Sequence, residues 1–247
     1  VTVALANVPR EEVPSYGVVV SEPDGRIVEF QEKPTVAEAR STTVNTGIYI
    51  FDPAVIDFIP AGRIFDIGSE LFPALIQHGA ELFGAEMPFQ WLDIGKITDY
   101  FRVTRMAVSG EVNGLSVPGT EIAPNVHVGL NVQIDLKSCH IAGPVHIGAG
   151  SRIEPGTTII GPTVIGRGCL IQAGAHVEKS ILFDYTSVSE HARLNEMMVC
   201  DGYFTDSSGA SVDLAKADIG WLLSDSRAER KSLTWEQENL VQMLQDW

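Results

Sequence analysis

Carboxylates and one lysine in the first part of the chain are placed where they could do chemistry. In "WLDIGK", Trp91 to Lys96, an apolar run ends on Asp93. An aspartate in such a place serves a turn, a helix cap or a metal ion, and a hard cation is rarely held by one carboxylate. In "FQEKP", Glu32 and Lys33 put opposite charges next to each other before a proline. Taken alone, that pair is typical of a surface ion pair.

Two further stretches combine glycine with polar residues. In "VNTGIYIF", Asn45 and Gly47 come at the start of an expected strand, where asparagine often bonds to local backbone. Gly17 follows Tyr16 before another expected strand, and a glycine there permits close approach to the backbone. A second "DIG" begins at Asp66, where Asp66 or Ser69 is expected to cap a helix. Each stretch alone has a structural explanation.

The order and spacing of these stretches are more specific than any one of them. Together they resemble the second half of the catalytic domain of sugar-1-phosphate nucleotidyltransferases, from about residue 1 to 109. The segments "FDIGSELFPALIQHG" and "WLDIG" resemble most the bacterial mannose-1-phosphate guanylyltransferase branch. The resemblance implies that a sugar 1-phosphate attacks the α-phosphate of a nucleoside triphosphate and that pyrophosphate leaves. Positioning and charge neutralisation lower most of the barrier in such a reaction.

The resemblance also implies roles for individual residues. Lys33 matches the lysine that binds the sugar phosphate, and Asp93 matches one of two aspartates that bind the catalytic Mg²⁺. The residues that match sugar contacts are Glu32, whose carboxylate accepts hydrogen bonds from hydroxyls, with Gly17, Asn45 and Gly47.

One part of the family pattern is absent from the sequence. No G-x-G pair occurs among the glycines before Gly110, so the glycine-rich loop that cradles the triphosphate is missing. The chain opens on Val1 within an apolar run, "VTVALANV". We therefore expect it to correspond to the C-terminal part of such an enzyme, with the second metal aspartate before Val1. We also expect that it cannot transfer a nucleotide alone.

Strand and helix patterns alternate over residues 1–110 and indicate a mixed α/β domain, which we expect to be part of a Rossmann-like nucleotidyltransferase domain. Pro23-Asp24-Gly25 predicts a hairpin turn. Expected strands are "VTVALANV", "YGVVV", "RIVEFQ", "TGIYIF", "ELFGAE" and "FQWLDI", and expected helices are one from Asp52-Pro53 with Val55, Ile56 and Ile59 on one face, "SELFPALIQHG", and one from about Thr98 to Ser109.

A different pattern occupies residues 111–205. Aliphatic residues recur at an interval of six, which no helix supports. Such hexads predict a left-handed parallel β-helix in which each aliphatic side chain points into a narrow prism. The unbroken series is Ile141, Ile147, Ile153, Ile159, Ile165, Ile171 and Val177, continued upstream by Ile122, Val128 and Ile134 and downstream by Leu182, Val188, Leu194 and Cys200.

Residues 206–247 are expected to form a helical tail. Thr234 stands three residues before Gln237, which is the spacing of a capping box. The apolar residues of one expected helix face follow, and they are Leu240, Met243, Leu244 and Trp247. We expect this helix to pack on the body of the protein or on another subunit.

Composition limits the possible partners. The 247 residues are 45% hydrophobic and 20% charged, as in globular proteins, with a net charge of -15. That charge argues against a nucleic acid or an anionic membrane as partner, but not against a small phosphorylated ligand. The three cysteines, Cys139, Cys169 and Cys200, lie far apart without metal-site spacing. They favour a reduced, cytoplasmic setting.

Two other interpretations remain open. Hexapeptide β-helices also build acyltransferases that use a histidine as general base, and five of the six histidines lie in or beside the repeat: His127, His140, His146, His176 and His191. Alternatively, the β-helix is a non-catalytic module for assembly or regulation. We expect a homo-oligomer formed through the β-helix or the C-terminal helix.

Overall fold

The computed structural model describes residues 1–228, 234, 236 and 237. The chain forms two compact units, Val1–Asp93 and Ile94–Trp247. The division falls before the helix at residues 97–108, whereas the sequence pattern placed it after that helix, at residue 110. Over the described residues, no helix combines the length and the apolar character that crossing a membrane requires.

The first unit is built on a five-stranded sheet in the order β3-β2-β4-β1-β5. β1 pairs with β4 antiparallel and with β5 parallel, while β2 and β3 form the hairpin predicted at Pro23-Asp24-Gly25. Gly25 closes this turn with a φ of 87°, which favours glycine. The strands are β1 (Thr2–Asn7), β2 (Gly17–Ser21), β3 (Ile27–Glu32), β4 (Thr43–Ile50) and β5 (Phe83–Glu86).

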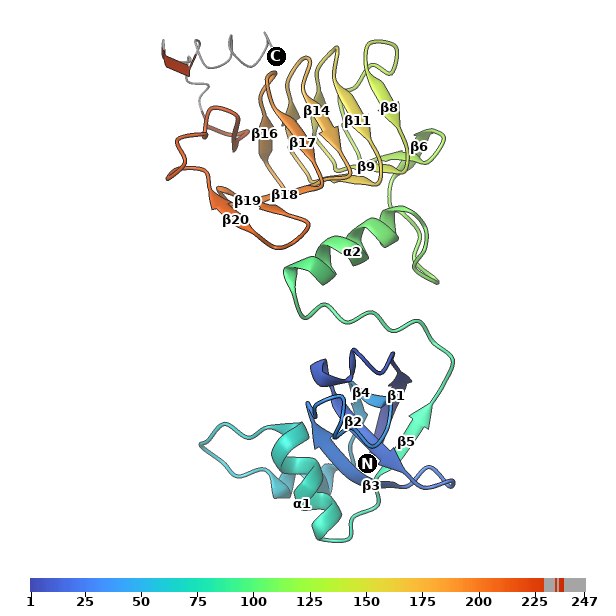
Figure 1. Ribbon diagram of the computed structural model, residues 1–247. Coiled ribbons are helices and arrows are strands. Elements are labelled where there is room, and N and C mark those ends of the chain that lie inside the picture. The colour runs from blue at the N-terminus through green and yellow to red at the C-terminus, as the bar shows by residue number, and fades with distance from the viewer. Residues whose placement is uncertain (229–233, 235, 238–247) are drawn as a thin grey trace. The chain divides into compact units, whose positions relative to one another are not determined.

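Short helices complete the first unit. α1 covers one face of the sheet (Figure 1), and Phe72 at its start is fully buried among the aromatic rings of Phe30, Tyr49 and Phe51. Val3, Leu5 and other alternate strand residues supply the sheet side of this core. The helical elements are η1 (Val13–Ser15), the 3₁₀ helix η2 (Pro53–Phe58), the π-helix η3 (Ile67–Leu71) and α1 (Phe72–Gln77).

Two expectations for this unit were wrong. The helix expected after Asp52 is the short 3₁₀ helix η2, and it buries Val55 but leaves Ile56 and Ile59 exposed. A 3₁₀ helix has three residues per turn, so Ile56 and Ile59 lie on one side of it and Val55 lies on another. The segment "FQWLDI" forms no strand. Its Trp91 packs instead on the Tyr16 ring, with centroids 5.1 Å apart, and joins a small core with Val13 and Val44.

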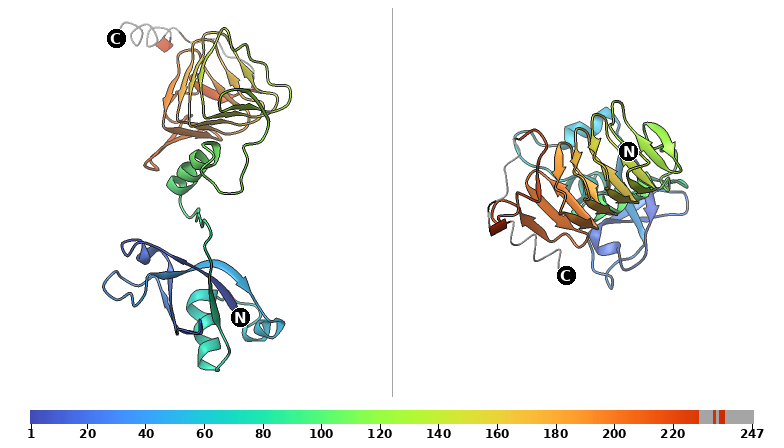
Figure 2. Two further views of the ribbon diagram at one scale, coloured as in Figure 1. Left: turned by 90° about the vertical axis from the view of Figure 1, so that its right-hand side faces the viewer. Right: turned by 90° about the horizontal axis from the view of Figure 1, so that it is seen from above.

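The second unit is a parallel β-helix, as the hexads predicted. In the middle coils, a strand residue pairs with residues of the neighbouring coils three hexads away along the chain, as Thr158 does with His140 and His176. Figure 2, left, views these coils nearly end-on. The strands of the coils are β7 (Val126–Val128), β8 (His140–Ala142), β9 (Val145–Ile147), β10 (Arg152–Ile153), β11 (Thr158–Ile160), β12 (Thr163–Ile165), β13 (Leu170–Ile171), β14 (His176–Glu178), β15 (Ile181–Leu182), β16 (Thr186–Val188), β17 (Arg193–Asn195) and β18 (Met197–Cys200), with β6 (Thr120–Ala123) antiparallel to β7.

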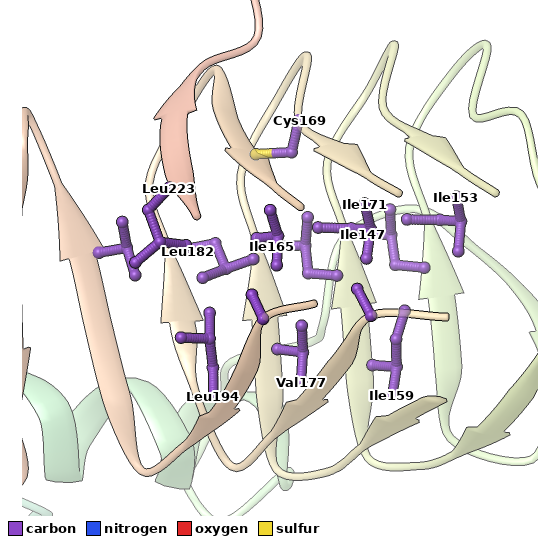
Figure 3. Packing of buried hydrophobic residues seen from close by; sticks show 14 of the residues in the cluster. Ile147, Ile153, Ile159, Ile165, Cys169, Ile171, Val177, Leu182, Leu194 and Leu223 are labelled. Atoms are coloured by element: carbon purple, nitrogen blue, oxygen red, sulfur yellow. The ribbon is translucent and has the colours of Figure 1, made fainter. Parts of the chain in front are cut away.

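The hexad residues fill the interior of the prism. Figure 3 shows the aliphatic side chains of successive coils stacked on one another inside the β-helix. Ile141, like the upstream hexad residues, is partly buried against this core, and Cys200 lies outside it at a hairpin between β18 and β19. The buried hexad residues are Ile147, Ile153, Ile159, Ile165, Ile171, Val177, Leu182, Val188 and Leu194.

The helix α2 (Ile97–Val108) packs on one sheet of the β-helix. Its Phe101 is buried against Ile181 and Met198. Its Arg105 guanidinium lies 3.4 Å from the Glu196 carboxylate. These contacts explain why α2 belongs to the second unit.

The chain after the hexads is less helical than expected. Residues 206–228 continue as strands and turns that close the β-helix, where a helical tail was expected. The predicted capping box is present, because the Gln237 N–H donates to Thr234 Oγ1 at 3.3 Å and the Thr234 N–H donates to Gln237 Oε1 at 2.9 Å. The rest of the expected tail helix lies outside the described residues. The closing strands are β19 (Tyr203–Asp206), β20 (Ser211–Asp213) and β21 (Leu223–Asp225).

Candidate functional site

Lys33 follows directly after β3 in an unusual backbone conformation. Its φ of 46° lies in the left-handed region, which costs a residue other than glycine about 1–2 kcal/mol. The Lys33 N–H donates to the Tyr16 carbonyl at 3.1 Å and so helps to hold this conformation. Backbone strain of this kind is concentrated at functional sites. Lys33 Nζ lies 3.9 Å from Glu32 Oε1, and both side chains reach solvent.

Glu32 is bordered by two glycines from distant parts of the chain. A Cβ on Gly17 would lie 3.1 Å from Glu32 Oε2, and a Cβ on Gly68 would lie only 2.7 Å from the same oxygen. Gly17 is paired with Glu32 across the β2–β3 hairpin, whereas Gly68 belongs to η3. The end of the hairpin and the start of η3 therefore meet at this carboxylate.

Asp66 adds a second carboxylate to this place. It caps η3, as predicted, by accepting hydrogen bonds from the Ser69 N–H at 2.7 Å and the Ser69 hydroxyl at 2.8 Å. These bonds lower the pKa of Asp66 below its usual value, and the positive charge of Lys33 lowers it further. Asp66 is thus an ionised carboxylate within electrostatic range of Lys33.

Tyr49 connects β4 to the same group of residues. Its hydroxyl accepts a 2.7 Å hydrogen bond from Asn45 Nδ2. Burial raises the pKa of Tyr49, the bond from Asn45 opposes this, and the negative charges of Glu32 and Asp66 raise the pKa further. The Gly47 N–H donates to Asn45 Oδ1 at 2.9 Å, and Gly47 has a φ of 79°.

Asp93 is the remaining residue of the predicted site. It is exposed and is the last residue of the first unit, two residues beyond the packed Trp91. Among the residues that the structure describes, no cluster of three or more histidine, cysteine, aspartate or glutamate side chains is arranged to hold a metal ion. Mg²⁺ needs about six oxygen ligands, many of them from water and phosphate. Asp93 supplies one carboxylate toward such a set.

The structure thus brings together most of the predicted site. Gly17, Glu32 and Lys33 meet Asp66, which the sequence indicated only as a cap. Gly68 and Tyr49 were missed. The signal for Gly68 was the repeated "DIG", and the signal for Tyr49 was its place in the same stretch as Asn45. Asn45 and Gly47 reach the group through Tyr49. We call the set Gly17, Glu32, Lys33, Asn45, Tyr49, Asp66 and Gly68 the β3–η3 cluster.

Two known families match separate parts of this chain. Residues 1–109 match the nucleotidyl transferase family, and residues 144–179 match the bacterial transferase hexapeptide family, which is defined by six repeats. The chain therefore carries a nucleotidyl transferase domain followed by hexapeptide repeats.

The names of individual relatives specify a sugar phosphate and a nucleotide. A UTP–glucose-1-phosphate uridylyltransferase from Synechocystis is 46% identical over 226 residues, which is 92% of this chain and 58% of that protein. A mannose-1-phosphate guanylyltransferase from Mycobacterium tuberculosis is 30% identical over 69% of this chain and 41% of that protein. A glucose-1-phosphate adenylyltransferase from Desulfitobacterium hafniense is 28% identical over 81% of this chain and 50% of that protein. The chain spans about half the length of these relatives.

Proposed function

We propose that the β3–η3 cluster binds a sugar 1-phosphate for nucleotidyl transfer. The observation that carries this proposal is the Glu32–Lys33 pair, held at the end of β3 between Gly17 and Gly68 and next to the Asp66 carboxylate. It combines one exposed ammonium group with two carboxylates, which is the chemistry that one phosphate and several hydroxyls require.

Different residues of the β3–η3 cluster bind different groups of the proposed ligand. The Lys33 ammonium group binds the phosphate as a point charge. The Glu32 and Asp66 carboxylates accept hydrogen bonds from sugar hydroxyls, and the bond from Asn45 holds the Tyr49 hydroxyl in place beside them. In the transfer, a phosphate oxygen of the sugar 1-phosphate forms a bond to the α-phosphorus of the nucleoside triphosphate. The bond to the β-phosphate oxygen breaks, and pyrophosphate leaves with that electron pair.

Two sugars and three bases are named among the relatives. The uridylyltransferase at 46% identity covers more of this chain than the guanylyltransferase at 30%. We therefore propose glucose 1-phosphate and UTP as the first pair to test. The motifs alone resembled most the mannose-1-phosphate guanylyltransferase branch and left the sugar and the base open. Mannose 1-phosphate is then the comparison ligand.

Mg²⁺ would neutralise charge at the reacting phosphates when it is bound. The described residues do not assemble a full site for it, because Asp93 is one exposed carboxylate outside any three-residue cluster in that part of the chain. The β3–η3 cluster is proposed as the site for the sugar phosphate, and Asp93 would supply a ligand to Mg²⁺. We further propose that this chain alone does not release pyrophosphate, since its first 109 residues contain no G-x-G pair.

Saturation-transfer NMR tests the proposal. Glucose 1-phosphate and mannose 1-phosphate should each receive saturation from the protein, and inorganic phosphate should compete with them. Free glucose at the same concentration should bind far more weakly, because it lacks the group that Lys33 recognises. Equal binding of free glucose and glucose 1-phosphate would contradict the proposed function.

The β-helix is proposed as an assembly module. One of its sheets is covered by α2, which leaves the sheet of β8, β11, β14 and β17 and the sheet of β10, β13, β16 and β21 as candidate surfaces for a second copy. Light scattering tests this, and a monomer would contradict it. Acyl transfer stays the alternative proposal, because it needs only one histidine as general base. The histidines divide between faces, with His127 beside His146 on one sheet and His140 in register with Thr158 and His176 on another.

A further inference from the structure

The backbone of Gly68 lies against the carboxylate of Glu32. A Cβ on Gly68 would be 2.7 Å from Glu32 Oε2, which is closer than a Cβ atom normally approaches another heavy atom. Its φ lies outside the left-handed region, so the backbone at this position accepts any residue. The need for glycine at residue 68 is therefore steric, and the atom that creates it is the carboxylate oxygen of Glu32.

Gly17, on the β2–β3 hairpin, also lies close to this oxygen of Glu32. Its added Cβ would lie 3.1 Å from Glu32 Oε2 and 2.9 Å from the Phe30 ring. The other oxygen, Oε1, faces Lys33 Nζ at 3.9 Å. One oxygen of the carboxylate thus fits a slot between two glycines, and the other is directed to the lysine.

We infer that Gly68 is a positioning residue, which with Gly17 forms a slot that fixes the orientation of the Glu32 carboxylate for a sugar hydroxyl. This inference rests on the proposed function and adds to it a residue that touches no ligand. Because the atom in the slot is the end of a flexible side chain, a methyl group at residue 68 displaces Glu32 rather than the backbone. Fold stability should therefore change little, while recognition of the sugar changes.

The first experiment measures sugar binding in a double-mutant cycle. Gly68→Ala and Glu32→Gln should each weaken the binding of glucose 1-phosphate, measured by isothermal titration, by about tenfold, the value of a hydrogen bond to a charged group. The double variant should be no weaker than Glu32→Gln alone, because both changes act through one carboxylate. Additive losses would overturn the inference. Inorganic phosphate should bind all these variants as it binds the unaltered chain.

The matched control is Gly220→Ala. An added Cβ at Gly220 meets no atom within 4 Å, and its φ is also outside the left-handed region. This variant should bind glucose 1-phosphate like the unaltered chain. If Gly68→Ala does not fold, Gly17→Ala provides the second test, since its Cβ approaches the same oxygen.

A second measurement needs no ligand, so it tests the slot between Gly17 and Gly68 independently of the proposed function. The negative charge of Glu32 contributes to the raised pKa of Tyr49. Gly68→Ala should change the pKa of Tyr49, followed by NMR of isotope-labelled tyrosine rings, and the change should vanish in the E32Q background, where no charge is displaced. A change of the same size in both backgrounds, or none in either, would overturn the slot. Failure of glucose 1-phosphate to bind the unaltered chain would instead overturn the proposed function.

Discussion

Asn45 Nδ2 donates a 2.7 Å hydrogen bond to the hydroxyl of Tyr49, four residues further along the same strand. In a regular strand these two residues would be about 13 Å apart. Here Val3 and Leu5 on β1 pair with Tyr49 and Asn45, so β4 contains two residues more than its partner. The irregularity includes Gly47 and brings the amide to the phenol.

This bond leads to a prediction for the pKa of Tyr49. Asn45→Ala removes a hydrogen bond that lowers the pKa, so the pKa should rise further above its usual value near 10. Glu32→Gln should lower it, because a negative charge that disfavours the phenolate is gone. NMR titration of the tyrosine rings measures both, with Tyr203 of the second unit as reference. A shift in the same direction in both variants would contradict the arrangement.

Gly47→Ala should destabilise the first unit. The φ of Gly47 is 79°, and no atom lies within 4 Å of an added Cβ, so the cost is backbone strain without a clash. We expect a loss of about 1–2 kcal/mol in the free energy of unfolding. Urea denaturation measures it, with Gly220→Ala as the control that should be unchanged within about 0.5 kcal/mol. Equal stability of Gly47→Ala and Gly220→Ala would rule out backbone strain for alanine at residue 47.

The sequence predicted the pairs that are adjacent along the chain and missed those that only folding brings together. Glu32, Lys33 and Asn45 stand in recognisable stretches. Gly68 reaches Glu32 because η3 returns to the end of β3, and no local pattern reports that contact. Tyr49 was missed because a regular strand would carry it away from Asn45.

Sequence periodicity predicted the buried residues of the second unit better than those of the first unit. Each coil of the β-helix repeats the same contacts, so Ile147 and Ile165 could be assigned to the core from spacing alone. The first unit is irregular. Ile56 and Ile59 had the spacing of a helical face, but Pro53 starts only a short 3₁₀ helix there. In "FQWLDI" the apolar residues suggested a strand, whereas the Trp91 ring packs at a tilt against the Tyr16 ring.

Phe101→Ala should release α2 from the β-helix. The Phe101 side chain is 4% exposed and packs on Ile181 and Met198. Truncation of a buried phenylalanine costs about 3–5 kcal/mol, so the second unit should unfold at markedly lower urea. Arg102→Ala on the exposed side of the same helix is the control and should change stability by less than about 0.5 kcal/mol. Similar losses in both variants would contradict this packing.

The β-helix should lose stability in mild acid through His146. Burial lowers the pKa of His146, and the neighbouring His127 lowers it further. The unfolded chain takes up a proton near the usual pKa of about 6.5, while the folded chain does so only at lower pH, so stability falls as pH drops below about 6.5. Urea denaturation at pH 7.5 and 5.5 should show a smaller loss in His146→Asn than in His140→Asn, an exposed control. The same loss in both would exclude His146 as the cause.

The central claim is that Lys33 and its neighbours bind a sugar 1-phosphate. Isothermal titration of glucose 1-phosphate into the chain, into Lys33→Gln and into the control Lys137→Gln tests it most directly. We predict that Lys33→Gln weakens binding by at least about tenfold, since a charge-assisted bond to the phosphate is lost, and that Lys137→Gln binds normally. Equal affinity of Lys33→Gln and the unaltered chain would contradict it.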